Sequence, residues 1–254
     1  MSAHYTDINA KTVDGWVAQG WEWGQPISRE TYRQALAGEW QMLLTPLRPV
    51  PKDWYPALKG CRVLGLACGG GQQMPIFAAL GAEGTVLDYS LSQLKSEEEV
   101  AAREGYDIRI VRHDMTRPLP FEDEAFDLIF HPVSNCYIEQ VRPLWRECLR
   151  VLRPGGILMA GLDIGPNFMF DDAETTLSHR LPYNPLKDPD LIREALKTGD
   201  GVQFSHTLEE QIGGQLEAGF TLTHLYEDTN GYGRLHDFGI PCFAATRAVK
   251  AYRR

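Results

Sequence analysis

The sequence has no apolar run near the roughly 18 residues that a membrane-spanning helix needs. Its first residues, Met1 to Asp7, contain neither a basic segment nor an apolar one, so we expect no signal peptide there. It has only five cysteines in 254 residues, and none of them forms a CxxC pair. This scarcity argues against a disulfide framework and against a structural zinc site. Together these absences favour a cytoplasmic protein with reduced thiols and no membrane partner.

An excess of positive charge is missing as well. Asp and Glu number 34 against 25 Lys and Arg, which gives a net charge of −9. Because nucleic-acid backbones are bound through basic surfaces, we expect no nucleic-acid partner. The composition is 43% hydrophobic and 23% charged, close to globular averages, which excludes a disordered or fibrous chain. The length leaves either one large α/β domain or one domain with a sizeable appendage.

From Cys61 onward, short apolar runs alternate with segments of helical periodicity. We predict five strands, at 62–67, 85–88, 108–111, 126–131 and 156–162. Helices are expected after the glycines at 69–71, from Ser90, and from about Ile138 to Leu152. The apolar runs lack polar alternation, as is typical of strands covered on both faces. This order predicts a parallel sheet with helices on both faces.

The flanking segments have a different character. The first sixty residues are rich in Trp and Pro, with a helix predicted from Ser28 to about Leu44 and an extended connector over Pro46–Pro56. Residues 164–206 look like an insertion with little regular structure beyond a helix near 191–196. A capping box, Thr207 with Glu210, opens a helix to Ala218. Two final strands, 220–226 and 240–246, suit an antiparallel return through a glycine-rich link.

Four motifs carry candidate chemistry. Val63-Leu64-Gly65-Leu66-Ala67-Cys68-Gly69-Gly70-Gly71-Gln72-Gln73 is a strand, a glycine turn and a helix start, where the backbone can approach a ligand closely. Asp88 follows the second strand and can accept hydrogen bonds from both hydroxyls of a ribose, although it could instead cap the next helix. His113-Asp114-Met115 follows the third strand, where Asp114 can meet an adenine amino group. Leu149-Arg150-Val151-Leu152-Arg153-Pro154-Gly155-Gly156 ends a helix and turns into a strand.

In this order and spacing, the four motifs resemble class I S-adenosylmethionine-dependent methyltransferases of the small-molecule, methyltransferase type 11-like branch. The match runs from about Cys61 to Leu162. The resemblance implies a Rossmann-like, doubly wound α/β sheet of seven strands, mostly parallel with an antiparallel last strand. We expect a single domain made of an N-terminal helical cap (1–60), a cofactor-binding half (61–163), an insertion after the fifth strand (164–206) and a closing helix and strand pair (207–254).

The resemblance also implies a cofactor, S-adenosylmethionine, and roles for particular residues. Gly69 and Gly71 would lie under its methionine part, Asp88 would hold the ribose, and Tyr89 would stack beside the adenine. The implied cofactor-binding set is Ala67, Gly69, Gly71, Gln72, Asp88, Tyr89, His113, Asp114, Met115 and His131. Two positions depart from the family pattern, since Gly65 replaces an acidic residue and Ala67 replaces a glycine. No metal-ligand constellation is visible.

Methyl transfer is an in-line displacement, so a general base is needed only when the acceptor is protonated. His131 is the first candidate for that base and His236 the second, with His131 as a strand-end or cofactor contact the alternative. We expect the acceptor chamber beyond the carboxyl ends of the strands. Its candidate lining is Trp16, Trp21, Trp23, Phe168, Phe170, Tyr183, Tyr232, Arg234 and His236.

The expected activity is therefore methyl transfer from S-adenosylmethionine to a small-molecule acceptor. An NAD(P)-dependent oxidoreductase is the first alternative, because Asp88 suits its ribose too, but Met74 stands where that fingerprint needs a third glycine. A non-catalytic binder of S-adenosylmethionine or S-adenosylhomocysteine is the second alternative. Among the remaining features, Glu97-Glu98-Glu99 is interpreted as a solvated helix face, and Trp40 and Trp145 as core residues.

Overall fold

The computed structural model describes residues 4–252. Residues 1–3 of the predicted N-terminal cap and residues 253–254 of the predicted closing segment lie outside the described residues. Seven strands form one sheet in the order β3-β2-β1-β4-β5-β7-β6. Their bounds are β1 Arg62–Leu66, β2 Glu83–Asp88, β3 Ile108–Arg112, β4 Phe126–His131, β5 Leu152–Asp163, β6 Phe220–Asp228 and β7 Phe243–Lys250.

The first five strands are parallel, and β7 runs antiparallel to both β5 and β6. Eight α-helices accompany the sheet within residues 4–252: α1 Tyr5–Ala18, α2 Arg29–Leu36, α3 Gln73–Ala79, α4 Leu91–Glu104, α5 Arg142–Val151, α6 Pro189–Thr198, α7 Gly214–Ala218 and α8 Gly233–Asp237. The predicted seven-stranded, mostly parallel fold with an antiparallel last strand is confirmed.

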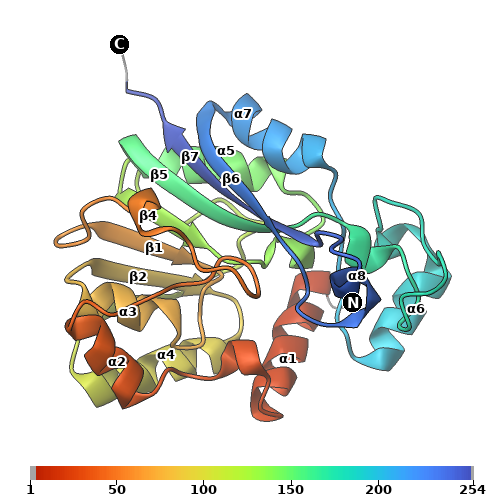
Figure 1. Ribbon diagram of the computed structural model, residues 1–254, viewed down its shortest axis with the longest axis horizontal. Coiled ribbons are helices and arrows are strands. Elements are labelled where there is room, and N and C mark those ends of the chain that lie inside the picture. The colour runs from red at the N-terminus through yellow and green to blue at the C-terminus, as the bar shows by residue number, and fades with distance from the viewer. Residues whose placement is uncertain (1–3, 253–254) are drawn as a thin grey trace.

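Helices cover both faces of the sheet (Figure 1). On one face, Val63 and Phe130 of the strands pack with Phe77 of α3. On the other face, Ile129 packs with Trp145 of α5. Two buried clusters therefore hold the sheet between helices, which explains why its strands are apolar on both sides.

The segment after α2 departs from the prediction. α2 ends at Leu36, and the predicted continuation to Leu44 is wrong. Gly38 follows with a φ of +89°, a left-handed conformation that ends helices. Beyond it, Met42 and Leu44 are both only 2% exposed, and the backbone N–H of Val50 donates to the Met42 carbonyl. Met42 and Leu44 are two residues apart, and side chains at this spacing point to the same side of an extended segment. Tertiary packing therefore overrides the helical pattern of the sequence.

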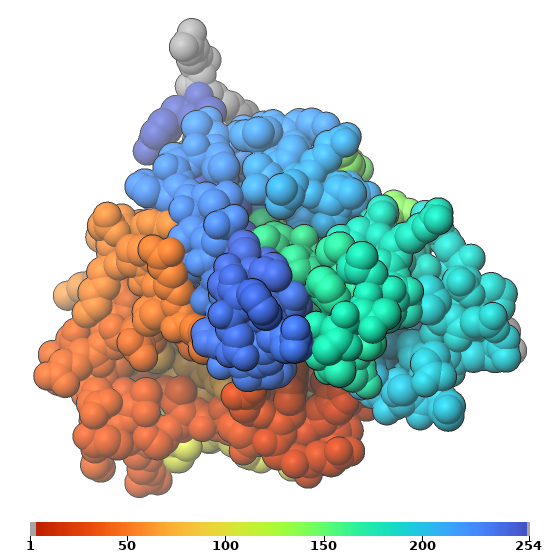
Figure 2. Space-filling view, turned by 45° about the vertical axis from the view of Figure 1, so that its right-hand side comes forward, coloured from red at the N-terminus to blue at the C-terminus, as the bar shows by residue number. Residues whose placement is uncertain are grey.

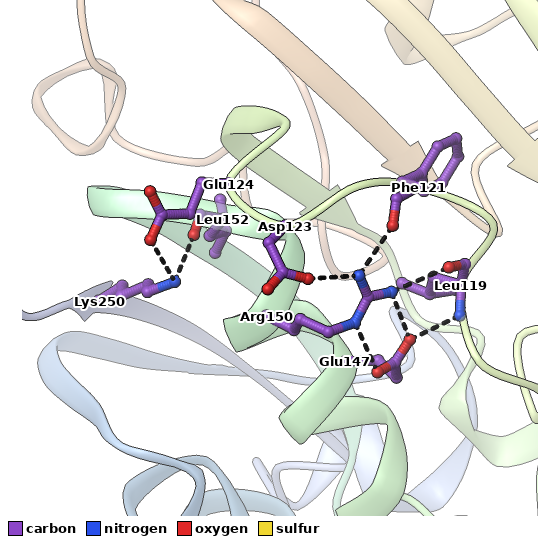
Figure 3. Close-up of polar contacts among 8 residues, drawn as sticks. All are labelled: Leu119, Phe121, Asp123, Glu124, Glu147, Arg150, Leu152 and Lys250. Atoms are coloured by element: carbon purple, nitrogen blue, oxygen red, sulfur yellow. Dashed lines mark hydrogen bonds and ion pairs between the residues drawn. The ribbon is translucent and has the colours of Figure 1, made fainter.

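The motif Leu149–Gly156 anchors the turn from α5 into β5 (Figure 3). The Arg150 guanidinium donates to the carbonyls of Leu119 and Phe121 and to the carboxylates of Asp123 and Glu147. These bonds tie the loop before β4 to the end of α5. The motif thus has a structural role, because it holds the end of α5 against the loop that leads into β4.

Three segments far apart in the sequence meet on one surface (Figure 2). They are the N-terminal residues, the 164–206 segment and the link between β6 and β7 that contains α8. Within the 164–206 segment, α6 extends over Pro189–Thr198, longer than predicted, since the side chain of Asp188 accepts hydrogen bonds from the first helical N–H groups. No helix in residues 4–252 is long and apolar enough to cross a membrane.

Candidate active site

A cavity of about 700 Å³ opens at the carboxyl ends of the parallel strands. Its walls come from the ends of β1, β2 and β5, the loops after β3 and β4, and helices α1 and α6. This is where open α/β sheets bind ligands, and the volume is typical of a small-molecule site.

The glycine loop after β1 rests directly on the start of α4. A Cβ atom at Gly69 would lie 2.7 Å from the Cβ of Gln93, so only glycine fits there. The backbone N–H of Gly69 donates to Asp88 Oδ2 at 3.1 Å. The loop and the end of β2 are thereby held together at the cavity.

Asp88 also holds Ser90, the residue that caps α4, because its Oδ1 accepts the backbone N–H of Ser90 at 2.9 Å. Burial raises the pKa of Asp88 above its ordinary value, although hydrogen bonds from the backbone N–H groups of Ser90 and Gly69 oppose this rise. A carboxylate has about four acceptor sites, so both oxygens retain capacity to accept further hydrogen bonds. Asp88 lines the cavity and fits the role of ribose acceptor.

Helix α1 is bonded to the same edge of the sheet. The Tyr89 hydroxyl donates to Asp7 at 2.6 Å, and the Thr6 hydroxyl donates to Asp114 at 2.9 Å. Asp14 accepts from the Ser90 hydroxyl at 2.6 Å. α1 is therefore held against the part of the cavity wall that β2 and the loop after β3 form.

The structure brings most of the predicted cofactor residues into one cavity. Those that line it are Ala67, Gly69, Gln72, Asp88, Tyr89, His113, Asp114 and Met115. The lining does not include Gly71 or His131. The Gly71 N–H instead donates to the Glu97 carboxylate at 3.0 Å, so Gly71 joins the glycine loop to α4.

Glu97 corrects a prediction. It is 0% exposed, although Glu97–Glu99 was expected to form a solvated face; only its two neighbours in the run are exposed. Its second oxygen accepts the Tyr106 hydroxyl at 3.2 Å. Burial raises the pKa of Glu97 to about 7, and hydrogen bonds from Tyr106 and Gly71 oppose that rise. The carboxyl supports the glycine loop from beneath.

The two departures from the family pattern have structural counterparts. A Cβ at Gly65 would lie 2.5 Å from Met74 Sδ, so Met74 fills the space in which the family's acidic side chain begins. Ala67 has a φ of +47°, a conformation that glycine adopts more readily. An acidic side chain at position 65 would therefore require Met74 to move.

His131 lies below the cavity. It is 0% exposed, and its Nδ1 lies 2.8 Å from the Leu66 carbonyl oxygen. Since a carbonyl only accepts, Nδ1 carries the proton, and Nε2 has no hydrogen-bond partner in residues 4–252. Burial lowers the pKa of His131 to about 4, against a rise from the Leu66 bond. The geometry favours a role in joining β4 to β1, and the general-base role stays a prediction.

The second candidate base lies elsewhere. His236 is on α8, and its Nδ1 lies 2.6 Å from the Thr229 hydroxyl. It does not line the cavity, and neither do three other predicted chamber residues, Trp16, Tyr232 and Arg234. The predicted aromatic residues that do line it are Trp21, Trp23, Phe168, Phe170 and Tyr183.

Sequence reasoning missed Asp163, the last residue of β5. Its side chain lines the cavity yet is only 6% exposed. The signal was available, because an acidic residue at the carboxyl end of a buried parallel strand lies at the ligand edge, as Asp88 does. Other missed lining residues are Thr6, Asn9, Gln93, Ser134 and Tyr137, which non-local packing brings there.

The site fits S-adenosylmethionine on its own chemistry. Its glycine loop, the Asp88 carboxylate and the Asp114 carboxylate all line the cavity. Gln93 lines the cavity as well, and its buried Oε1 has no partner within the described chain, so an acceptor is available for a ligand donor. Residues 4–252 contain no cluster of three or more His, Cys, Asp or Glu that could hold a metal ion.

Comparison with known proteins agrees with this site. Residues 64–160 match the model of a methyltransferase domain family. An uncharacterized methyltransferase of Bacillus subtilis (strain 168), YbaJ, is 40% identical over 249 residues, which cover 95% of this chain and 97% of that protein. A demethylmenaquinone methyltransferase of Renibacterium salmoninarum is 34% identical over 116 residues, 46% of this chain and 47% of that one.

Solved structures share the fold. The crystal structure of an S-adenosylmethionine-dependent methyltransferase from Mesorhizobium loti superposes with a TM-score of 0.62 at 22% identity, covering 78% of this chain and 95% of that chain. The fold, the glycine loop and the similarity to YbaJ over nearly the whole chain all indicate the same family. The chain belongs to the class I S-adenosylmethionine-dependent methyltransferases, and S-adenosylmethionine is its cofactor.

Proposed function

We propose that the protein transfers a methyl group to a small-molecule acceptor by in-line displacement inside the cavity. The observation that carries the proposal is the continuity of this cavity, which extends from the glycine loop and Asp88 to Asp163 and the aromatic residues of the 164–206 segment. Its volume of about 700 Å³ accommodates a nucleoside cofactor beside a second small molecule.

The chain's own residues would mainly bind and orient. Asp88 would accept hydrogen bonds from the ribose, Asp114 and Met115 would frame the adenine, and the loop around Gly69 would lie under the methionine part. When bound, S-adenosylmethionine supplies an electrophilic methyl group on a sulfonium. Alignment of the acceptor with that methyl is the principal contribution of the protein.

We also propose that residues 1–60 and 164–206 are covers of a single domain. Asn9 of α1 makes three hydrogen bonds that support this, donating to the Tyr137 and Val202 carbonyls and accepting from the Val202 N–H. These bonds join α1 to both the loop after β4 and the end of the insertion. Closure by these segments would exclude water and large acceptors, and a relative named for demethylmenaquinone supports an acceptor of small-molecule size.

The test is a screen of small molecules with S-adenosylmethionine, read by mass spectrometry. We expect a product heavier by one CH₂ group together with S-adenosylhomocysteine. Binding of the cofactor without any methylated product across phenols, alcohols, thiols and amines would favour the non-catalytic alternative. A product only from peptides or nucleic acids would contradict the small-molecule acceptor.

A further inference from the structure

We propose that the acceptor is an amine, recognised by the carboxylate of Asp163 at the end of β5. The proposal rests on the proposed methyl transfer and names the substrate class for the same cavity. Asp163 is separated from the glycine loop by β4, since the sheet order places β4 between β1 and β5. Asp163 therefore stands on the acceptor side of the chamber.

Asp163 is a buried carboxylate with unused capacity. Its Oδ1 accepts the Gly165 N–H at 2.8 Å, and its Oδ2 accepts the Asn167 side-chain amide at 2.8 Å. Within residues 4–252 no Lys, Arg or His forms an ion pair with it. Burial raises the pKa of Asp163 to about 6, and the bonds from Asn167 and Gly165 only partly oppose that rise. A charge held in this way is costly unless a cation or donor completes it.

Asp127 provides a contrast, because cationic side chains of the same protein neutralise its carboxylate. It receives the guanidinium groups of both Arg62 and Arg153. Although burial raises the pKa of Asp127, the hydrogen bonds from Arg62 and Arg153 outweigh it and leave the pKa below its ordinary value. Asp163 has no such partner, but it faces a cavity. A protonated or polar N–H group of a ligand would supply what the chain does not.

The charges around the cavity support the same class of ligand. Its acidic lining residues are Asp88, Asp114, Asp163, Asp172, Glu194 and Asp200, and no described Lys or Arg lines it. An acceptor that carries a carboxylate or phosphate would meet repulsion without a counter-charge. A protonated amine would be attracted by the carboxylates that line the cavity.

Aromatic rings stand beside Asp163. Phe243 is its register partner on β7, so the two side chains emerge on the same face of the sheet, and both line the cavity. Phe168 and Tyr183 stack at 5.3 Å between ring centroids and line the cavity too. A carboxylate with aromatic walls suits an organic ammonium group, since ring faces attract cations.

The reaction balances with this acceptor. An acceptor bound as an ammonium first releases one proton to water. The lone pair of the resulting neutral amine forms a bond to the methyl carbon, the carbon–sulfur bond breaks, and its electron pair returns to sulfur. S-adenosylhomocysteine and an N-methylammonium product result, and the ammonium releases its proton to water. Positive charge thus moves from sulfur to nitrogen, where the Asp163 carboxylate stabilises it.

The test is calorimetric titration of the S-adenosylhomocysteine-loaded protein with three probes of matched shape: 2-phenylethylamine, 2-phenylethanol and phenylacetate. We expect the amine to bind at least roughly tenfold more tightly than the alcohol, and phenylacetate to bind most weakly. Asp163→Asn is expected to remove the preference for the amine and to leave the affinity for S-adenosylhomocysteine unchanged. Asp107→Asn is the matched control, because Asp107 is exposed and outside the cavity.

Equal or tighter binding of the alcohol or the acid, no binding of the amine, or an unchanged preference in Asp163→Asn would each overturn the proposal. The ranking of the three probes in the wild-type protein needs no variant, so the test holds even if Asp163→Asn fails to fold. The affinity for S-adenosylhomocysteine is measured separately. If the wild-type protein does not bind S-adenosylhomocysteine, the result contradicts the proposed function. If it binds S-adenosylhomocysteine but does not prefer the amine, the result contradicts only this inference.

Discussion

Acidic side chains in this protein have pKa values shifted in different directions because their partners differ. Asp127, which is only partly buried, receives two guanidinium groups, and its pKa lies below its ordinary value. Glu97 receives only the Gly71 N–H and the Tyr106 hydroxyl, and burial raises its pKa to about 7. The charge state of the carboxyl beneath the glycine loop therefore changes near neutral pH.

The pKa of Glu97 predicts a stability profile. Its folded value of about 7 exceeds the ordinary 4.5, so its contribution is fully present below about pH 4.5 and is lost as pH rises through 7. At about 1.4 kcal/mol per pKa unit, the loss amounts to roughly 3 kcal/mol. Glu97→Gln does not ionise. Its amide oxygen can accept the Gly71 N–H and its amide N–H can donate to the Tyr106 oxygen, so its free energy of unfolding should not show this loss.

Urea unfolding of both proteins at about pH 5 and about pH 8 measures the difference. Glu98→Gln, one residue along and exposed, is the matched control and should behave like the wild type. The same fall in stability in Glu97→Gln as in the wild type would show that Glu97 is not the group responsible.

His131 is the residue whose predicted role is most sharply testable. Removal of its bond to the buried Leu66 carbonyl costs about 1–3 kcal/mol, so His131→Asn should lower Tm while turnover by the folded protein changes little. Thermal denaturation and steady-state kinetics on one preparation separate the two effects. A fall in kcat of about a hundredfold or more, with unchanged S-adenosylhomocysteine affinity, would instead support the general-base prediction.

At the scale of elements, the central strands were predictable from sequence. The predicted 126–131 strand coincides with β4, and 62–67 differs from β1 by one residue. Buried parallel strands produce continuous apolar runs, so local sequence suffices for them. The predicted extension of α2 to Leu44 was wrong because Met42 and Leu44 are buried by distant partners. The predicted exposure of Glu97 was wrong because the glycine loop after β1 covers its side chain.

Helix α1 depends on Asn9 for its position. Three hydrogen bonds from this 6%-exposed side chain reach the loop after β4 and the end of the insertion. Asn9→Ala leaves buried backbone groups without partners, so we expect a loss of about 2–4 kcal/mol and faster amide hydrogen exchange around Tyr137 and Val202. Lys11→Ala, an exposed change on the same helix, is the control. Unaltered exchange at both positions in Asn9→Ala would contradict the assigned role.

Arg150 has the corresponding role for α5 (Figure 3). Lysine keeps the charge but lacks the planar fork that reaches two carbonyls and two carboxylates. Arg150→Lys should therefore lower the free energy of unfolding by about 1–3 kcal/mol. Chemical denaturation compares it with Arg146→Lys, an exposed position on the same helix. Equal stabilities of the two variants would mean that the fork contributes nothing beyond its charge.

At the scale of the whole molecule, the sheet positions the chemistry and the flanking segments enclose it. The gathering of Gly69, Asp88 and Asp114 in one cavity was predictable, because these residues stand at the carboxyl ends of consecutive strands that share one edge. The rest of the cavity lining was not predictable, since residues of α1, β5 and the 164–206 segment meet there only through tertiary packing. Asp163 is the exception that the strand-end rule would have found.

The acidic balance of the chain continues into the cavity, whose described lining has carboxylates but neither Lys nor Arg. The net charge of −9 thus matches the character of the site itself. Such a chamber suits a cationic cofactor, and it is unsuited to polyanionic acceptors.

The most direct test of the account is calorimetric titration of S-adenosylhomocysteine and NAD into the wild-type protein and into Asp88→Asn. The account predicts one S-adenosylhomocysteine bound per chain, no binding of NAD, and affinity for S-adenosylhomocysteine weakened by roughly tenfold or more in Asp88→Asn, because an amide oxygen replaces a charged acceptor of the ribose hydroxyls. Binding of NAD in place of S-adenosylhomocysteine, or equal affinity of the two proteins for S-adenosylhomocysteine, would contradict it.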